Sequence, residues 1–327
     1  MSRFLLILLL PIVMNAQQSY PTLGKIISYD DTSFAAIVSS GARIEVLATG
    51  IKWAEGPVWV KDGGYLLFSD APQNTIFRWD EKGGLQVFLK PSGYTGLGAY
   101  SDEPGSNGLL VNPQGELVAC EHGDRRISKM RLAGGGKVTI ADNWQGRRFN
   151  SPNDICRHSN GTYYFSDPIY GLPGRENDTA NREIDAEGVY SVDANGKVTQ
   201  ILGNPERPNG VALSPDETLL YVSHSSGKNP YIMAYELDKH GVAGKGRIFF
   251  DFREHKEVSK GAADGIKTDA AGNLYAAAAN GIVVISPKGK LLGKIETGVP
   301  TANCNFGADG YLYITANHYL CRVKLGK

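Results

Sequence analysis

The chain has 327 residues, of which 42% are hydrophobic, so it is long enough and apolar enough to fold around a substantial core. Its 34 basic residues balance its 34 acidic residues, and it lacks the electrostatic pattern of a nucleic-acid-binding protein. Forty glycines and sixteen prolines are spread along the whole chain. This distribution indicates many turns between short strands and argues against disorder.

The first 16 residues have the pattern of an export signal. Arg3 precedes the apolar run 4–13, and Ala16 leads into a polar stretch. The apolar run is too short to span a bilayer. We therefore expect cleavage after Ala16, no transmembrane anchor afterwards, and a periplasmic or secreted protein; a buried N-terminal strand is the alternative. Residues 17–41 are expected to form an N-terminal segment.

The four cysteines lie inside apolar, strand-like runs, and none of their spacings is a zinc or redox motif. In an exported protein they could form disulfides. Because cysteine packs readily as a small hydrophobe, buried free thiols are the preferred interpretation. The residues are Cys120, Cys156, Cys304 and Cys321.

One hairpin pattern recurs six times along the chain. Each copy has a short strand, a polar turn and a second strand rich in Tyr, Leu and Val. The copies are "AEGPVWVKDGGYLLFSD", "SNGLLVNPQGELVACEH", "PNDICRHSNGTYYFSD", "PNGVALSPDETLLYVSH", "ADGIKTDAAGNLYAAAA" and "TANCNFGADGYLYITAN". A third strand-like stretch follows every copy and a fourth follows most of them, with no competing helical period.

Six four-stranded units at uneven spacings predict an all-β fold, a six-bladed β-propeller with antiparallel blades over residues 42–327. The sixth unit stops after its third strand at "YLCRVKL". We expect the N-terminal strand "ARIEVLA", near residue 45, to supply the missing outer strand and close the ring. Closure removes the open sheet edges that would favour aggregation.

Polar residues recur where the first strand of each hairpin begins. In a propeller this position lies on the rim of the central channel, and five of the six residues there carry a side-chain oxygen. The six positions are Glu55, Asn107, Asn153, Asn209, Asp264 and Ala302, with Asn303 as the alternative to Ala302 in the sixth unit. A single pair such as Asn-Gly is an ordinary turn former, but a matching set from several blades indicates a shared role.

Burying these groups without partners would cost about 1–3 kcal/mol each, and more for a charge, so the set predicts a bound cation. Glu55 and Asp264 would supply carboxylates, and Asn153 and Asn209 would supply amide oxygens. Hard oxygen donors favour a single Ca²⁺ ion, with Mg²⁺, Mn²⁺, Fe²⁺ or Zn²⁺ as alternatives.

The second strand of each hairpin returns to the same rim. Its last residues are candidates for orienting a polar ligand or moving protons, or have surface roles. They are Asp70, Glu121, His122, Asp167, His224, Asn317 and His318. Two long loops, ahead of Asn107 and after Asp167, also emerge there and could wall a pocket. Their Arg175 and Arg182 are expected to be solvated.

With these features the chain from about Glu55 onward resembles the SMP-30/gluconolactonase/luciferin-regenerating family of six-bladed calcium propellers, and above all its bacterial gluconolactonase-like members. The resemblance rests on the order and spacing of several motifs, each weakly specific alone. They are "WAEGPVW", "CEHGDRRI", "RRFNSPNDI", "YYFSDPIYGL", "RPNGVALSPDE", "GAADGIKTDAAGNLY" and "PTANCNFG".

The resemblance implies hydrolysis of a small-molecule sugar lactone, with a metal held by Glu55, Asn153, Asn209 and Asp264. It makes Asp264 a candidate general base, with His122 and His224 as other proton acceptors. The substrate-binding candidates are Asn107, Glu121, Asn153, Asp167, Tyr170 and Asn303. Animal members carry an Arg that binds the lactone two residues before the Asn matched to Asn153, where this sequence has Ser151.

Other functions remain open at this point. The chain could be a promiscuous hydrolase of lactones or phosphoesters, or a non-catalytic propeller that binds a ligand or protein at its rim. Oligomeric state does not follow from the sequence. A serine or cysteine nucleophile is not expected, because no G-x-S-x-G motif is present and the cysteines lie in strands.

Overall fold

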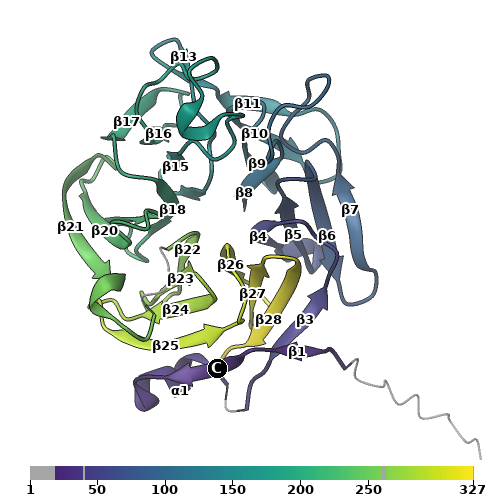
Figure 1. The fold of residues 1–327 in the computed structure, drawn as a ribbon, viewed down its shortest axis with the longest axis vertical. Helices are drawn as coiled ribbons and strands as arrows, with labels where there is room; N and C mark the ends of the chain where they lie inside the picture. Colours follow the sequence, from purple (N-terminus) through teal and green to yellow (C-terminus); the bar gives the residue numbers. More distant parts are fainter. Residues whose placement is uncertain (1–18, 40, 259–262, 327) are drawn as a thin grey trace, which may run out of the picture.

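The computed structural model describes residues 19–39, 41–258 and 263–326. Six antiparallel sheets are arranged around a central axis, so the fold is the predicted six-bladed propeller (Figure 1). The first strand of each blade is innermost and contacts the first strand of the next blade, and the last blade contacts the first. The predicted signal, residues 1–16, lies outside the described residues.

Each blade runs from an inner to an outer strand in chain order. Blade 1 contains β4 (Ala54–Val60), β5 (Tyr65–Asp70), β6 (Thr75–Asp80) and β7 (Gly84–Leu89). Blade 2 contains β8 (Ser106–Val111), β9 (Glu116–Glu121), β10 (Arg126–Arg131) and β11 (Val138–Ala141). Blade 3 contains β14 (Ile155–Arg157), β15 (Tyr163–Asp167), β16 (Gly188–Val192) and β17 (Val198–Gly203).

Blade 4 contains β18 (Pro208–Leu213), β19 (Leu219–His224), β20 (Tyr231–Leu237) and β21 (Ala243–Asp251). Blade 5 contains β22 (Ile266–Thr268), β23 (Leu274–Ala278), β24 (Gly281–Ile285) and β25 (Leu291–Glu296). Blade 6 contains β26 (Asn303–Phe306), β27 (Tyr311–Ala316) and β28 (Tyr319–Lys324). Shorter elements are the hairpin β12 (Asn143–Trp144) and β13 (Arg147–Arg148), and the 3-10 turns η1 (Lys61–Gly63), η2 (Arg175–Asn177) and η3 (Phe252–Glu254).

The N-terminal part of the chain completes the ring. β3 (Ile44–Ala48) pairs with β28 as the fourth strand of blade 6, as predicted, and β1 (Thr22–Leu23) pairs with β3. β2 (Lys25–Ser28) adds a fifth strand to blade 5 beside β25, and α1 (Asp31–Ile37) packs on the same blade. Residues expected to precede the propeller are thus built into two of its sheets.

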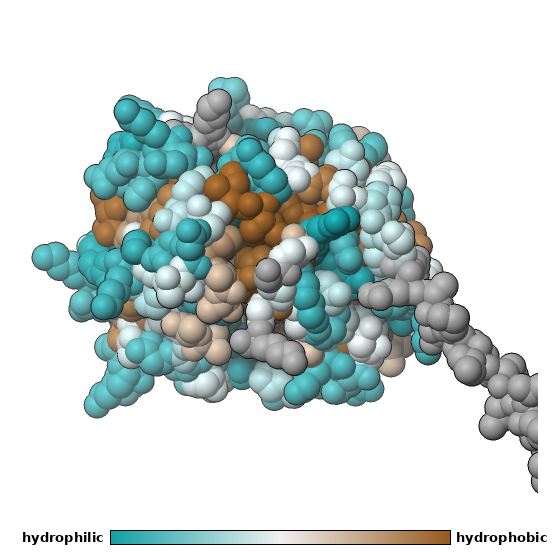
Figure 2. All heavy atoms as spheres, turned by 90° about the horizontal axis from the view of Figure 1, so that it is seen from below, coloured by the Kyte–Doolittle hydropathy of each residue, from teal (hydrophilic) through white to brown (hydrophobic). Residues whose placement is uncertain are grey.

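The side of the ring that carries this N-terminal part has an apolar area at its centre, surrounded by mostly hydrophilic surface (Figure 2). A groove of about 540 Å³ lies beside α1, lined by residues such as Ile37, Leu292 and Phe306. Among the described residues, no helix has the length and hydropathy needed to cross a membrane.

The core lies between blades rather than in one central mass. Within the described residues, six clusters of buried hydrophobic side chains each join two neighbouring blades; one of them packs Val118 and Ile127 of blade 2 against Phe165 and Tyr190 of blade 3. Because every strand places alternate side chains on its two faces, each sheet contributes to two clusters. All four cysteines lie in strands and are free thiols, as expected, and Cys156 is the one that is only partly buried.

Candidate functional site

The polar residues at the rim lie where strand pairing is interrupted. In β4, β8 and β18 the register with the second strand shifts at Glu55, Ser106 and Pro208, so the residues that follow bulge out of the sheet. In blades 3 and 5 the candidates come just before the first strand. Bulges re-aim side chains, and here they turn oxygen-bearing groups toward the channel mouth instead of into the core between blades.

A glycine follows four of the rim residues, Glu55, Asn107, Asn209 and Asp264, and allows the blades to approach one another closely. A Cβ at Gly56 would lie 2.0 Å from the Asn107 carbonyl oxygen, and one at Gly210 would lie 2.5 Å from the Asp264 carbonyl oxygen. The Gly210 amide donates to that oxygen at 3.2 Å. Similarly, the Gly108 amide donates to the Asn153 carbonyl oxygen at 2.7 Å. The Glu-Gly, Asn-Gly and Asp-Gly pairs therefore connect neighbouring blades through their backbones.

Serine hydroxyls from the second strands brace the same backbone. Ser69 Oγ donates to the Asn107 carbonyl oxygen at 2.8 Å, and Ser223 Oγ donates to the Asp264 carbonyl oxygen at 2.6 Å. Both serines are completely buried. The rim residues are thus held by the neighbouring blade, which fixes their positions relative to one another.

A pocket of about 170 Å³ opens at this rim. It contains six of the residues predicted from the sequence: Glu55, Asn107, Asn153, Tyr170, Asn209 and Asp264. Three further residues line it: Trp53, Glu103 and Ser225. Trp53 is part of the "WAEGPVW" motif and Ser225 directly follows His224, but Glu103 lies in the loop before blade 2 and carries no repeat signal.

Two carboxyl groups dominate the electrostatics of the pocket. Glu55 is buried and accepts hydrogen bonds from Trp53 Nε1 at 3.1 Å and from its own neighbour's amide, whereas Asp264 is partly exposed. Burial raises the pKa of both, the charge of Asp264 adds to the rise at Glu55, and Asp154 and Glu103 add to the rise at Asp264. Several acidic groups lie close together with little solvent to stabilise their charges, so a bound cation would stabilise the ionised carboxylates.

The three asparagines offer amide oxygens to the same space. Asn209 donates a side-chain hydrogen bond to the Asp264 carboxylate, which leaves its own oxygen as an acceptor. Asn107 is buried, and its Oδ1 has no hydrogen-bond partner among the described residues. A buried acceptor without a donor costs about 1–3 kcal/mol, so Asn107 is suited to contact a ligand or an ion.

His122 orients the third amide. Its Nδ1 lies 3.1 Å from the Glu103 carbonyl oxygen, so Nδ1 carries the proton and Nε2 is the acceptor. The Asn153 amide nitrogen lies 3.4 Å from that Nε2. This arrangement leaves Asn153 Oδ1 as the end of the amide that is free for the pocket.

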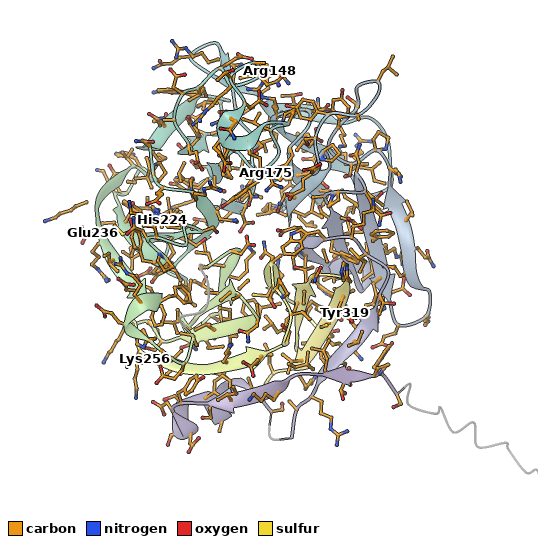
Figure 3. All side chains as sticks on the ribbon, viewed as in Figure 1. Arg148, Arg175, His224, Glu236, Lys256 and Tyr319 are labelled. Carbon is orange, nitrogen blue, oxygen red and sulfur yellow. The ribbon has the colours of Figure 1, made fainter. Side chains whose placement is uncertain are left out.

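His224 has a similar setting in blade 4, and Figure 3 labels it there. Its Nδ1 lies 3.0 Å from the Glu206 carbonyl oxygen, and its ring packs on Tyr231 with centroids 4.7 Å apart. Burial lowers the pKa of both His122 and His224, so both rings are neutral near pH 7. Neither ring lines the pocket.

The remaining sequence candidates also lie outside the pocket lining. Glu121 is buried and forms ion pairs with Arg126 at 2.7 Å and Lys137 at 2.6 Å. Asp167 accepts the backbone amides of residues 150 and 151, each at 2.8 Å, and so caps the loop that enters its own blade. Asn303 Oδ1 lies 3.3 Å from Lys267 Nζ, which also pairs with Asp154 at 3.1 Å.

Ser151 lies just before β14 and has a structural role, because it holds the loop between β15 and β16 of blade 3. It is completely buried, its Oγ donates to the Pro168 carbonyl oxygen at 2.7 Å, and the Gly171 amide donates to it at 3.0 Å. These bonds hold the start of the loop that carries Tyr170. The hydroxyl is therefore already used and does not reach the pocket.

The fold and this pocket define a six-bladed propeller with an acidic, oxygen-lined site at one mouth of its channel. Residues 53–318 match the family model for the SMP-30/Gluconolactonase/LRE-like region. The chain belongs to this family.

Several relatives cover most of the chain. It is 40% identical over 311 residues to a gluconolactonase of Zymomonas mobilis, covering 93% of this chain and 86% of that protein. A pentonolactonase of Haloferax volcanii is 26% identical and covers 83% of each chain. The solved structure of a gluconolactonase from Xanthomonas campestris has a TM-score of 0.81 with 29% identity, covering 96% of this chain and 99% of that one.

Proposed function

We propose that this protein hydrolyses a sugar lactone with a divalent metal ion bound in the pocket at the rim. The observation that carries the proposal is the convergence of Glu55, Asn153, Asn209 and Asp264, from four blades, in one small pocket. The similarity to gluconolactonases of two bacteria supports the reaction type.

These four residues fit a hard divalent ion such as Ca²⁺. They provide two carboxylates and two amide oxygens, and Asn107 adds a buried oxygen without a donor. Among the described residues no group of three His, Cys, Asp or Glu side chains is placed to hold a metal, so the proposed ligand set depends on its amides. When bound, the ion would polarise the lactone carbonyl as a Lewis acid.

Asp264 is the proposed proton acceptor for the attacking water. It is the carboxylate of the pair that remains partly exposed to the pocket, whereas Glu55 is buried and already accepts two hydrogen bonds. His122 and His224 are weaker candidates, because both rings lie outside the pocket lining and the basic Nε2 of His122 already faces the Asn153 amide nitrogen.

The direct test is hydrolysis of glucono-, xylono-, galactono- and homoserine lactones, with and without EDTA. We expect turnover of at least one sugar lactone, its loss in EDTA, and its return on addition of Ca²⁺ or another divalent ion. Turnover of phosphoesters instead would favour a broader hydrolase. Metal binding with no turnover of any substrate would favour a ligand-binding propeller.

Asp264→Ala should lower kcat/KM by at least about 100-fold while the propeller stays folded, because it removes both a ligand and the proton acceptor. Circular dichroism checks the fold and metal titration checks the site. Asp62→Ala is the matched control, since Asp62 lies exposed in η1 away from the pocket. Full activity of the Asp264 variant would remove this residue from the mechanism.

We also propose that the protein acts in the periplasm or outside the cell. The support is the signal-like pattern of residues 1–16. Cell fractionation, together with the N-terminal sequence of the mature protein, tests this location, and a start at residue 17 is the expected result.

A further inference from the structure

Glu103 brings a third carboxylate into the pocket from the loop that precedes blade 2. Its carbonyl oxygen accepts the Nδ1 proton of His122 at 3.1 Å, and its carboxylate accepts from Arg175 Nη2 at 3.3 Å. The backbone and the side chain are therefore both held. These two contacts, with His122 and Arg175, fix the position of Glu103 at the pocket.

Arg175 reaches Glu103 from the other long loop. It opens η2, in the loop between β15 and β16 of blade 3, and in Figure 3 it lies near the centre of the ring. Its side chain is 44% exposed, so it is only partly solvated, although the sequence suggested a solvated residue. The Arg175–Glu103 ion pair thus joins the two loops beside the pocket.

The Glu103 carboxylate has unused hydrogen-bond acceptor positions with which it can bind a ligand. Within the described part of the chain it accepts one side-chain hydrogen bond, from Arg175, whereas a carboxylate has about four acceptor positions. Burial raises the pKa of Glu103, and Arg175 opposes that rise. A partly desolvated acceptor of this kind discriminates strongly in favour of ligands that donate hydrogen bonds to it.

Hydroxyl recognition cannot come from residue 151 in this chain, because the Ser151 hydroxyl is buried in contacts with Pro168 and Gly171. Glu103 lies in the same pocket as Tyr170 but comes from the opposite loop. A ring lactone with its carbonyl near Glu55 and Asp264 would then present its hydroxyl groups to the loops.

We propose that Glu103, positioned by Arg175, accepts hydrogen bonds from substrate hydroxyl groups and so selects polyhydroxylated lactones over unsubstituted ones. This inference rests on the proposed lactonase function and specifies the substrate class of that site.

The test compares glucono-δ-lactone with δ-valerolactone, which has the same ring without hydroxyl groups. For Glu103→Gln we expect kcat/KM on glucono-δ-lactone to fall about 10- to 100-fold, mainly through KM, and to fall at most about threefold on δ-valerolactone. Arg175→Met should change the same ratio in the same direction by a smaller factor. Asp102→Asn, an exposed neighbour in the same loop, is the control and should leave both rates unchanged.

Two results of these assays would overturn the inference. One is an unchanged rate of Glu103→Gln on glucono-δ-lactone; another is an equal loss on both lactones, which would indicate a metal ligand or a structural role. If the wild type hydrolyses neither lactone, the proposed function fails. The role of Glu103 in binding hydroxyl groups is then tested separately, by calorimetric titration of the wild type and of Glu103→Gln with 1,5-anhydroglucitol. Binding weaker than wild type in Glu103→Gln would support hydroxyl recognition, and equal binding would refute it.

Discussion

His122 illustrates how one buried residue can matter without touching a substrate. Its ring connects the Glu103 carbonyl group to the Asn153 amide, so the loop before blade 2 helps to fix which end of that amide faces the pocket. A proton on Nε2 would break this arrangement, because Nε2 could then no longer accept from the amide.

Stability should depend on pH through the same ring. Burial lowers the pKa of His122 to about 4, whereas the unfolded chain has a histidine pKa of about 6.5. Between these values only the unfolded state binds the proton, so the free energy of unfolding falls as pH falls, by up to about 1.4 kcal/mol per pH unit. Urea denaturation without metal should show a shallower slope between pH 4.5 and 6.5 for His122→Gln, and an unchanged slope for the exposed His240→Gln.

The five oxygen-bearing rim residues could be found from the sequence because they recur at one position of a repeat. The structure places all five in the lining of one pocket. The residues at the ends of the second strands reach the same rim, but the direction in which each side chain points decides what it contacts, and the sequence does not reveal that direction. Asp167, for example, turns back to cap two amides of its own blade. Glu103 could not be found, because only the folded loop brings it to the pocket.

At the level of elements, the bulged starts of the first strands join the blades and shape the site together. A Cβ at position 210 would overlap the Asp264 carbonyl oxygen and approach the Ile266 amide nitrogen to 2.6 Å. Gly210→Ala should therefore lower the free energy of unfolding by about 1–3 kcal/mol and reduce lactone turnover as well. Thermal denaturation and kinetics measure the two effects.

Gly227→Ala in the same blade is the matched control, because a Cβ there meets no atom within 4 Å. It should have the stability and activity of the wild type. Wild-type behaviour of Gly210→Ala would mean that the blades can separate at the rim at no cost, contrary to the backbone contacts described above.

The blades themselves could be predicted because their strand pattern and turns are local signals. The strands that the N-terminal part of the chain adds to the sheets were harder to predict. β3 was predictable because it fills a place that the sixth repeat leaves empty, whereas β2 has four residues and pairs with a strand far along the chain. Such a pairing depends on the assembled sheet and has no local signature.

At the level of the whole molecule, Arg322 of β28 anchors the closing strand. It pairs with Glu45 of β3 at 2.7 Å and with Glu81 beyond β6, and its guanidinium lies 4.1 Å from the Tyr311 ring centroid. Arg322→Ala should lower the free energy of unfolding by about 2 kcal/mol, because these partly exposed partners lose their cation. Denaturant titration tests this loss.

Arg43→Ala, an exposed change just before β3, is the control for Arg322 and should have no measurable effect. A similar stability for both variants would show that pairing of the backbones alone holds β3 in place.

The position of β3 also constrains the order in which the chain can fold during synthesis. β3 leaves the ribosome early, but its partner β28 is made about 270 residues later, and β2 likewise waits for β25. The early strands must therefore stay unpaired while most of the polypeptide is being translated. A chain that stalls before residue 319 lacks β28 and cannot close the propeller. The unpaired edges of the early strands therefore need protection from aggregation until translation is complete.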